Sequence, residues 1–351
     1  MQRQTKKYRN CQSMTRPTAP QRTRRAFSLV EIMIVLVIIG ILLGLLFPAI
    51  SKAITTARNA TVTSEISNLA KAIGEFKLKY GVEPPSRIYL HEDSSNWSNT
   101  DLRTRESKAF IRQVWPNFDF TYANAPTAGE LDINGNGMTD SDPIDLRGAE
   151  CLVFFLGGVC ATEDATGASI RGATGVLGSG SAPVTKWFPL GFSTDPEMPF
   201  ARGSGTRVGP FFEFDASRLV DVSDSPPANI LRNMPEYLDT LPGQTSPYLY
   251  ASSYEGRGYN VNGSFAHTDL NLASSSITEP TWVYLQSDPS TEGTAAAIPY
   301  NKNSFQIISP GADTQYGTGG SYDKDEGFTG FADGVQKDNI TNFSGGVLDA
   351  S

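Results

Sequence analysis

The stretch that decides the fold is Ala26-Phe27-Ser28-Leu29-Val30-Glu31, which joins a basic leader to a long apolar run. Glu31 is the only charged residue between Arg25 and Lys52. A bilayer core is crossed by about 20 apolar residues of helix, so the run predicts a membrane-spanning segment. An ionisable side chain in such a segment is costly and usually functional. We therefore expect Glu31 to have a charged partner.

The charge distribution predicts how the chain is oriented. Residues 1–26 carry eight Lys and Arg and no acid. Positive charge before the first apolar span keeps that end in the cytoplasm, so the residues after Lys52 are expected in the periplasm or outside the cell. The whole chain has 29 Lys and Arg against 37 Asp and Glu, a formal net charge of −8. Without the leader 21 basic residues remain against 37 acids, a net charge of −16. An exported part this acidic argues against a nucleic-acid partner and suits divalent cations.

The apolar pattern continues past the membrane with helical spacing. Side chains three or four positions apart form one stripe, made of Val62, Ile66, Leu69, Ile73, Phe76 and Tyr80. Gly81 and Pro84-Pro85 are expected to end the helix. We predict one helix over 27–80, with a membrane-spanning half at 27–51 and an amphipathic half within 52–81. The stripe needs a partner, and the globular domain at 82–351 is the obvious one. A free coiled coil is the alternative, but the stripe covers barely three heptads.

The globular domain is predicted to be loop-rich and to contain short strands. Gly, Ser, Asn, Asp and Pro separate short apolar runs, as is typical of strands joined by turns. The expected strands are Phe211–Phe214, Ser246–Ser252, Thr281–Gln286 and Ser304–Ile308, and Leu152–Leu156 predicts a short buried helix. Together these elements predict an α+β fold, with the long N-terminal helix packed on a small antiparallel sheet.

The junction at Ala26-Phe27 resembles a known processing site. It resembles the cleavage site of type IV pilins and type II secretion pseudopilins. That site has the order small residue, Phe, Ser or Thr, Leu, any residue and Glu, followed by an apolar stretch with a proline, here Pro48. The resemblance implies that prepilin peptidase cuts between Ala26 and Phe27 and methylates the new amino group of Phe27. It also implies that Glu31 attracts the N-terminal ammonium of a neighbouring subunit, and that the helix can melt at Pro48 when subunits pack. The family nearly always has Gly where this chain has Ala26.

A second resemblance lies near the C-terminus. The predicted strand at 304–308 runs into a Gly311-Ala312-Asp313 turn, similar to the C-terminal strand and calcium loop of major pseudopilins. The segment Ser246–Tyr250 also resembles their Asn-Pro-Tyr strand. The resemblance implies a calcium site that includes Asp313, Asp323 and Asp325. On this comparison, about 86–240 is a loop-rich insertion, much longer than in typical family members.

A further calcium site is predicted from spacing alone. Four oxygen-bearing side chains and the glycine at position 137 match an EF-hand-type loop, with Asp132, Asn134, Asn136 and Asp140 as the ligands. The twelfth position, normally a bidentate acid, is Pro143. Asp142, Asp145 or Glu150 are candidate replacements. An ordinary solvated turn is the alternative interpretation.

Two cysteines, Cys151 and Cys160, remain when the leader is removed. A disulfide between them and two separate buried thiols are both consistent with the sequence. Catalytic patterns are missing from the sequence: the flanks of His91 and His267 match no nucleophile or metalloprotease motif. The chain is therefore predicted not to be an enzyme.

Two functions remain. The first is a structural subunit of a type II secretion pseudopilus or type IV pilus-like filament, a single-pass inner-membrane protein that assembles with itself, other pilins and an inner-membrane platform. The second is a membrane-tethered binding module, a receptor for a surface or polymer that uses the leader only for export and anchoring. Glu31 favours the first, because a carboxylate there helps lateral assembly and is costly to a lone anchor. A twin-arginine export signal around Arg24-Arg25 is disfavoured, because the apolar core is too strong and helical sequence continues beyond it.

Overall fold

The structure is a computed structural model. It describes residues 28–164, 169–170, 184–203, 205–221, 234–259, 283–286, 298–317, 319–323, 327–328 and 334–348. The cleavage-site residues Ala26 and Phe27, His267 and the predicted calcium ligand Asp325 lie outside the described residues. The chain divides into two compact units, 1–54 and 55–351, and each is described by itself.

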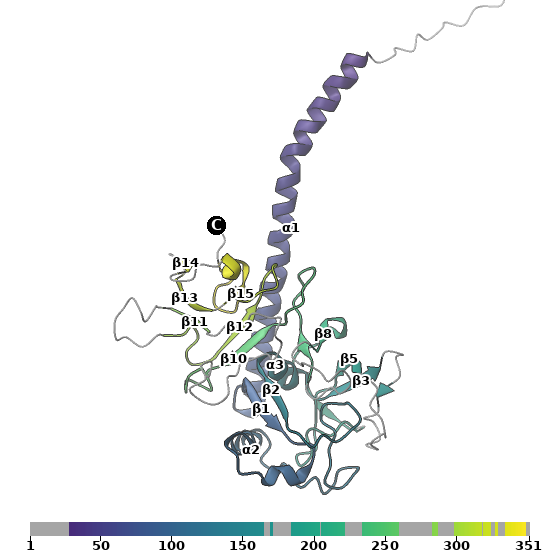
Figure 1. The fold of residues 1–351 in the computed structure, drawn as a ribbon, viewed down its shortest axis with the longest axis vertical. Helices are drawn as coiled ribbons and strands as arrows, with labels where there is room; N and C mark the ends of the chain where they lie inside the picture. The colour runs from purple at the N-terminus through teal and green to yellow at the C-terminus, as the bar shows by residue number, and fades with distance from the viewer. Residues whose placement is uncertain are drawn as a thin grey trace, which may run out of the picture. The chain divides into compact units, whose positions relative to one another are not determined.

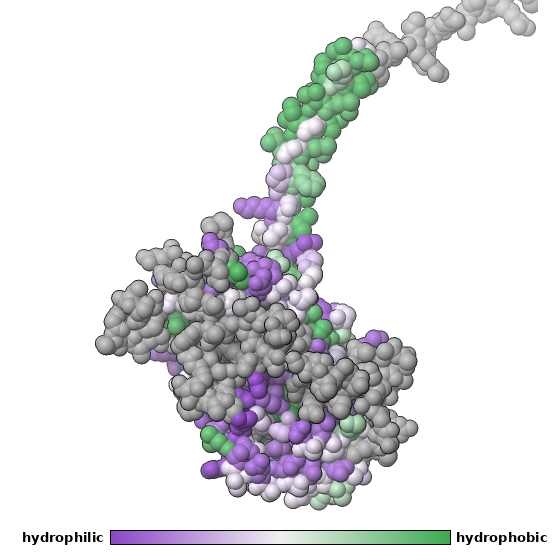
Figure 2. Space-filling model, viewed as in Figure 1, coloured by the Kyte–Doolittle hydropathy of each residue, from purple (hydrophilic) through white to green (hydrophobic). Residues whose placement is uncertain are grey.

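Helix α1 spans Leu29–Tyr80 as one continuous helix (Figure 1), so the predicted long helix is confirmed. Two hydrogen bonds cap its start: the Ser28 hydroxyl accepts from the Val30 amide at 3.3 Å, and the Glu31 carboxylate accepts from the Ser28 amide at 2.8 Å. Its N-terminal part is long and apolar enough to cross a membrane. Large apolar side chains from Leu29 to Ile50 are exposed, and Figure 2 shows this apolar surface. Pro48 lies inside the helix.

The C-terminal half of α1 supplies one wall of the hydrophobic core of the second unit. The predicted stripe is confirmed: its buried members are Val62, Ile66, Leu69, Ala72, Ile73 and Phe76, and Tyr80 is partly buried. Ala72 was not in the predicted stripe. The helix ends where Gly81 adopts a positive φ of 82° and its amide donates to the Lys77 carbonyl at 2.7 Å. Glycine favours this left-handed conformation, which stops a helix.

Helix α3, Gly148–Gly157, is buried along its whole length. It contains the predicted buried segment Leu152–Leu156 and extends it in both directions. The ring of Phe155 meets that of Phe76 edge-on, with 5.6 Å between centroids. Helix α3 also contacts strands β9 (Glu236–Tyr237) and β10 (Leu249–Ser252). Aromatic packing between α1 and α3 is thus central to the core.

The main sheet has the antiparallel order β10-β12-β15, with β12 at Phe305–Ser309 and β15 at Ile340–Thr341. Leu249 pairs with Ile308, and Ser309 pairs with Ile340. Two predicted strands, at 246–252 and 304–308, are confirmed with shifted ends. The predicted strand at 281–286 is present in its described part as β11, Tyr284–Leu285. It pairs in parallel with β13 (Gly320–Asp323), which also pairs with β14 (Gly327–Phe328).

The described residues of 86–240 form smaller elements, several of which share the main core with α1. They comprise β1 (Arg87–Leu90), η1 (Ser94–Ser98), α2 (Leu102–Val114), β2 (Ile144–Arg147), β3 (Cys160–Asp164), β4 (Ser169–Ile170), β5 (Val184–Pro189), β6 (Phe192–Ser193), β7 (Arg207–Val208), η2 (Ala216–Arg218) and β8 (Leu219–Val220), besides α3 and β9. The short helix η3 (Gly334–Asp338) follows later. Strand pairs join β1 to β2, β6 to β7 and β8 to β9, and β3 lies between β4 and β5.

The predicted strand at Phe211–Phe214 is wrong. The amides of Phe211 and Phe212 both donate to the Leu156 carbonyl near the end of α3, at 2.7 and 3.3 Å. Because both amides donate to this one carbonyl, neither is available for a bond to a neighbouring strand. The Phe211 ring lies 5.5 Å from that of Phe76, so the aromatic run serves the core as an irregular segment.

Candidate functional site

Glu31 lies in the first turn of α1 and is exposed. Its carboxylate accepts the amide of Ser28, the second residue after the predicted cut. The neighbouring side chains Val30, Ile32 and Ile34 are apolar and at least half exposed. A carboxylate is therefore held at the start of an apolar helix, four residues along the chain from the predicted new N-terminus.

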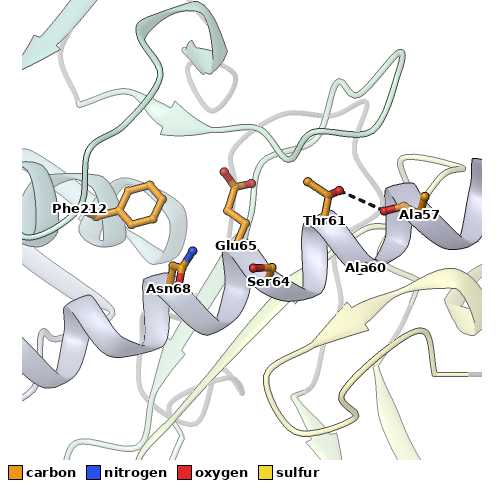
Figure 3. Close-up of a pocket in the computed structure, with 7 residues that line it drawn as sticks. All are labelled: Ala57, Ala60, Thr61, Ser64, Glu65, Asn68 and Phe212. Atoms are coloured by element: carbon orange, nitrogen blue, oxygen red, sulfur yellow. Dashed lines mark hydrogen bonds between the residues drawn. The ribbon is translucent and has the colours of Figure 1, made fainter.

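A groove lies along the part of α1 that belongs to the second unit, with a volume of about 480 Å³. Figure 3 shows its lining, which is mostly small helix residues with one ring from another segment: Ala57, Ala60, Thr61, Ser64, Glu65, Asn68 and Phe212. Ala57, Ala60, Ser64 and Asn68 are exposed. The globular domain thus leaves one face of the helix uncovered, and the small side chains on that face let another backbone approach closely.

Glu65, beside this groove, is tied into a polar cluster that the sequence did not predict. Its oxygens accept from the Arg218 guanidinium at 2.9 and 2.5 Å, from the Tyr248 hydroxyl at 2.7 Å and from the Tyr237 hydroxyl at 3.2 Å. Arg218 also donates to the Leu238 carbonyl at 3.0 Å. Burial, followed by the charge of Glu65, raises the pKa of Tyr248 well above its usual range. Both tyrosines are therefore neutral hydrogen-bond donors to the carboxylate.

The predicted calcium loop at 132–140 folds around the buried carboxylate of Glu92, which follows strand β1. One oxygen of Glu92 accepts the amides of Ile133 and Asn134, at 2.6 and 3.2 Å, and the other accepts that of Asp140 at 2.9 Å. Burial and the nearby charge of Asp132 raise the pKa of Glu92 to about 8. The hydrogen bonds from the Asp140 and Ile133 amides lower the pKa but do not offset this rise. Glu92 was missed because it lies some 40 positions upstream, where no loop pattern includes it.

Three of the four predicted ligands of this loop, Asn134, Asn136 and Asp140, come together. The side-chain Nδ2 groups of Asn134 and Asn136 donate to one Asp140 oxygen at 3.2 and 3.0 Å. Asp132 accepts the amides of Gly135 and Gly137, at 2.8 and 3.0 Å, and forms an ion pair with Arg202. Hard oxygens of this kind suit calcium. Among the described residues, however, no three acidic, histidine or cysteine side chains are grouped to hold a metal, so the asparagine oxygens would have to complete the set.

The C-terminal acids are only partly brought together. Asp338 accepts the amides of Ala312 and Asp313 at 2.6 and 3.1 Å, which places it over the predicted Gly-Ala-Asp turn. Burial raises the pKa of Asp313, and the charge of Asp338 adds to the effect. Asp323 ends β13 near Tyr300, whose pKa is raised by burial and by the Asp323 charge. Calcium binding here stays a prediction.

The two cysteines of the exported part are not joined by a disulfide. Both thiols are buried, and burial raises the pKa of Cys160 to about 12. Cys151 and Cys160 are therefore two separate buried thiols, the second of the two interpretations that the sequence left open.

Residues 21–47 match the family model described as the prokaryotic N-terminal methylation motif. The match includes Ala26, Phe27 and Glu31. No curated protein and no solved structure matched the chain. The motif and the long apolar start of α1 are together consistent with a type IV pilin-like protein. The motif implies processing by prepilin peptidase and assembly with other pilins in a filament. It also indicates membrane anchoring, and proteins with this motif are structural rather than enzymatic.

Proposed function

We propose that the chain is a structural subunit of a type II secretion pseudopilus or of a type IV pilus-like filament, and that it has no enzymatic activity. The observation that carries this proposal is the methylation motif at 21–47 with Glu31 as the only charge in its apolar run. The basic leader favours a cytoplasmic N-terminus, so before assembly the subunit is a single-pass protein of the inner membrane. An inner-membrane assembly platform then adds it to the filament.

The chemistry of Glu31 supports assembly through helix contacts. Cleavage before Phe27 creates an ammonium group four residues from this carboxylate. An unpaired carboxylate in hydrocarbon costs several kcal/mol. The N-terminal ammonium of a neighbouring subunit supplies the missing opposite charge, so lateral packing of subunits is favoured over a lone anchor.

The uncovered face of α1 supports the same proposal. In the second unit, the groove residues Ala57, Ala60 and Ser64 present small side chains to the outside. In the membrane segment, Gly40 and Gly44 have no heavy atom within 4 Å of where a Cβ would lie. Small residues spaced by three or four positions allow helices to approach closely. Each half of α1 therefore has a face suited to a neighbouring helix.

The test is a comparison of Glu31→Ala with Leu36→Ala, a control change on the same exposed helix. We expect Glu31→Ala to be exported and cleaved normally but to be lost from filaments, measured by cross-linking and by immunoblot of sheared filaments. Leu36→Ala should assemble. Normal assembly of Glu31→Ala would instead favour a membrane-tethered receptor for a surface or polymer.

We also propose that the loop at 132–140 binds calcium. Asp132, Asn134, Asn136 and Asp140 would supply the loop ligands, and Glu92 would supply the acid that Pro143 replaces at the twelfth position. The support is that the side chains of Asn134 and Asn136 meet that of Asp140, while Glu92 accepts backbone amides of the same loop. Calcium would compete with Arg202 for Asp132, so binding would be weaker than in a loop without an internal cation.

A further inference from the structure

One side of helix α2 carries three basic side chains, which we call the basic row: Arg105, Lys108 and Arg112. They follow one another at spacings of three and four positions, so they lie along the same side of the helix. At 1.5 Å per residue the row extends for about 10 Å. Arg105 and Arg112 are exposed, and Lys108 is half-buried. Helix α2 packs on strand β1 at the edge of the second unit (Figure 1), so the basic row is open to a partner.

Neutral groups hold two members of the basic row in place. The Nζ of Lys108 donates to the Trp97 carbonyl at 2.9 Å. This Nζ and the guanidinium carbon of Arg112 lie 4.9 and 5.2 Å from the centroid of the Phe120 ring. A carbonyl and an aromatic ring orient a cation without cancelling its charge. Two positive charges are therefore fixed side by side around one ring.

No carboxylate neutralises the basic row within the described part of the chain. The ion pairs formed by described residues involve other bases. Burial and the charge of Arg112 lower the pKa of Lys108, as expected for a cation beside another cation. The Asp101 carboxylate, at the start of α2, accepts the amide and hydroxyl of Thr104 at 2.9 and 2.8 Å. Glu106 lies one and two positions from Arg105 and Lys108, so it faces another way.

The exported part as a whole has the opposite charge. Residues 27–351 carry 21 Lys and Arg against 37 Asp and Glu, a net charge of −16. Copies packed in a filament repel one another unless opposite charges meet where they touch. Screening limits the reach of each charge to about 8 Å at physiological salt, so local contacts matter more than net charge. Several elements present exposed carboxylates that could meet the basic row of another copy: Glu75, Asp195, Glu197, Glu213 and Asp215.

We propose that the basic row is a docking surface for a second copy of this chain, whose exposed carboxylates pair with its three cations. This docking rests on the proposed filament function, and it adds a contact between exported domains to the contact between helices. The cations and the carboxylates lie on different elements, so the contact joins unlike surfaces. Contacts of this kind that do not close into a ring form open helical filaments. Charge complementarity then sets the register of the two copies more than their affinity.

Charge reversal in the basic row tests this docking in cells that assemble the full-length protein. Arg105→Glu combined with Arg112→Glu should lower the recovery of subunits in sheared filaments about tenfold, because repulsion replaces two exposed ion pairs. Lys79→Glu combined with Lys302→Glu is the matched control. It makes the same change in net charge at exposed positions outside α2 and should alter recovery less than twofold. Equal melting temperatures of the purified proteins establish that both variants are folded.

The wild-type protein separates failure of the docking from failure of the filament function. A wild-type protein that enters no filament contradicts the proposed function itself. If the wild type and the Arg105/Arg112 variant both assemble equally well, only the docking is refuted. An equal loss in the Lys79/Lys302 control also refutes the docking, because net charge and not the position of the basic row would then control assembly.

A photoreactive amino acid placed at Ala109 identifies what covers the basic row without changing its charges. Ala109 is exposed and lies between Arg105 and Arg112 along α2. In filaments we expect it to cross-link to a second copy of this chain, at a peptide with exposed carboxylates that mass spectrometry identifies. The same amino acid at Glu106, on another side of α2, should cross-link at least fivefold less. Cross-links from position 109 to a different protein, or none in assembled filaments, would overturn the proposal.

Discussion

Glu65 and Arg218, 153 positions apart in the chain, form a two-point ion pair with N–O distances of 2.9 and 2.5 Å. Glu65 belongs to α1, and Arg218 ends the short helix η2. Their side chains are 12 and 21% exposed. The pair is further held by the Tyr248 hydroxyl, 2.7 Å from Glu65. It fastens the C-terminal half of α1 to a segment that is distant in sequence.

Glu65→Gln should lower the free energy of unfolding by about 2–3 kcal/mol, because it leaves a partly buried guanidinium without its counter-charge. Urea unfolding followed by tryptophan fluorescence measures the change. Glu75→Gln is the control, since Glu75 is exposed on the same helix and its loss should cost less than about 0.5 kcal/mol. If the two variants lose equal stability, the Glu65–Arg218 pair is not what joins these segments.

The buried thiols give a prediction about reactivity. Because burial raises the pKa of Cys160 to about 12, its thiol stays protonated at pH 8 and should not react with iodoacetamide in the folded protein. In urea, both thiols of the processed chain should become modified, as mass spectrometry would record. A disulfide would contradict this expectation, because neither thiol would then react even in urea.

The same raised pKa makes stability depend on pH in the alkaline range. The folded protein holds the Cys160 proton to a higher pH than the unfolded chain, whose thiol titrates near its ordinary value of 9. The contribution of this group is therefore complete below pH 9 and falls as the pH rises from 9 towards 12. Cys160→Ala should flatten the decline in melting temperature over that range relative to the wild type. An unchanged decline would show that the Cys160 thiol is not buried as described.

Calcium should raise the melting temperature of the full-length protein relative to chelator. At a hundredfold excess over the dissociation constant, binding to the folded state adds about 2.7 kcal/mol. Magnesium should replace calcium poorly, because it demands a smaller and more regular shell. Asp132→Asn and Glu92→Gln should each remove the shift, whereas Asp323→Asn should not. The reverse pattern would place the site at the C-terminal acids, and equal melting temperatures in calcium and chelator would refute both sites.

Features set by local periodicity could be predicted from the sequence. The stripe from Val62 to Phe76 determines which helix face is buried, and the Gly81 stop follows from its short-range signal. Strands β10 and β12 were also recognised from their runs of apolar and aromatic residues. The run at 211–214 has the same composition but a different role, because the Leu156 carbonyl takes its amides.

Features set by contacts between distant segments could not be predicted. The spacing of residues 132–140 indicated a loop with converging oxygens, and Asn134, Asn136 and Asp140 do converge. Nothing local indicated that Glu92 would lie within that loop or that Arg202 would pair with Asp132, 70 positions away. Such pairs depend on the tertiary packing of several short elements, which no sequence period encodes.

The most direct test of the pilin-like assignment is the N-terminal mass spectrum of the protein extracted from membranes. Cleavage between Ala26 and Phe27, followed by methylation, predicts a first residue of N-methylphenylalanine at position 27. The motif at 21–47 implies processing by prepilin peptidase, and this start would leave Glu31 as the fifth residue of the mature chain. An intact leader, or a chain that begins after residue 50, would contradict it.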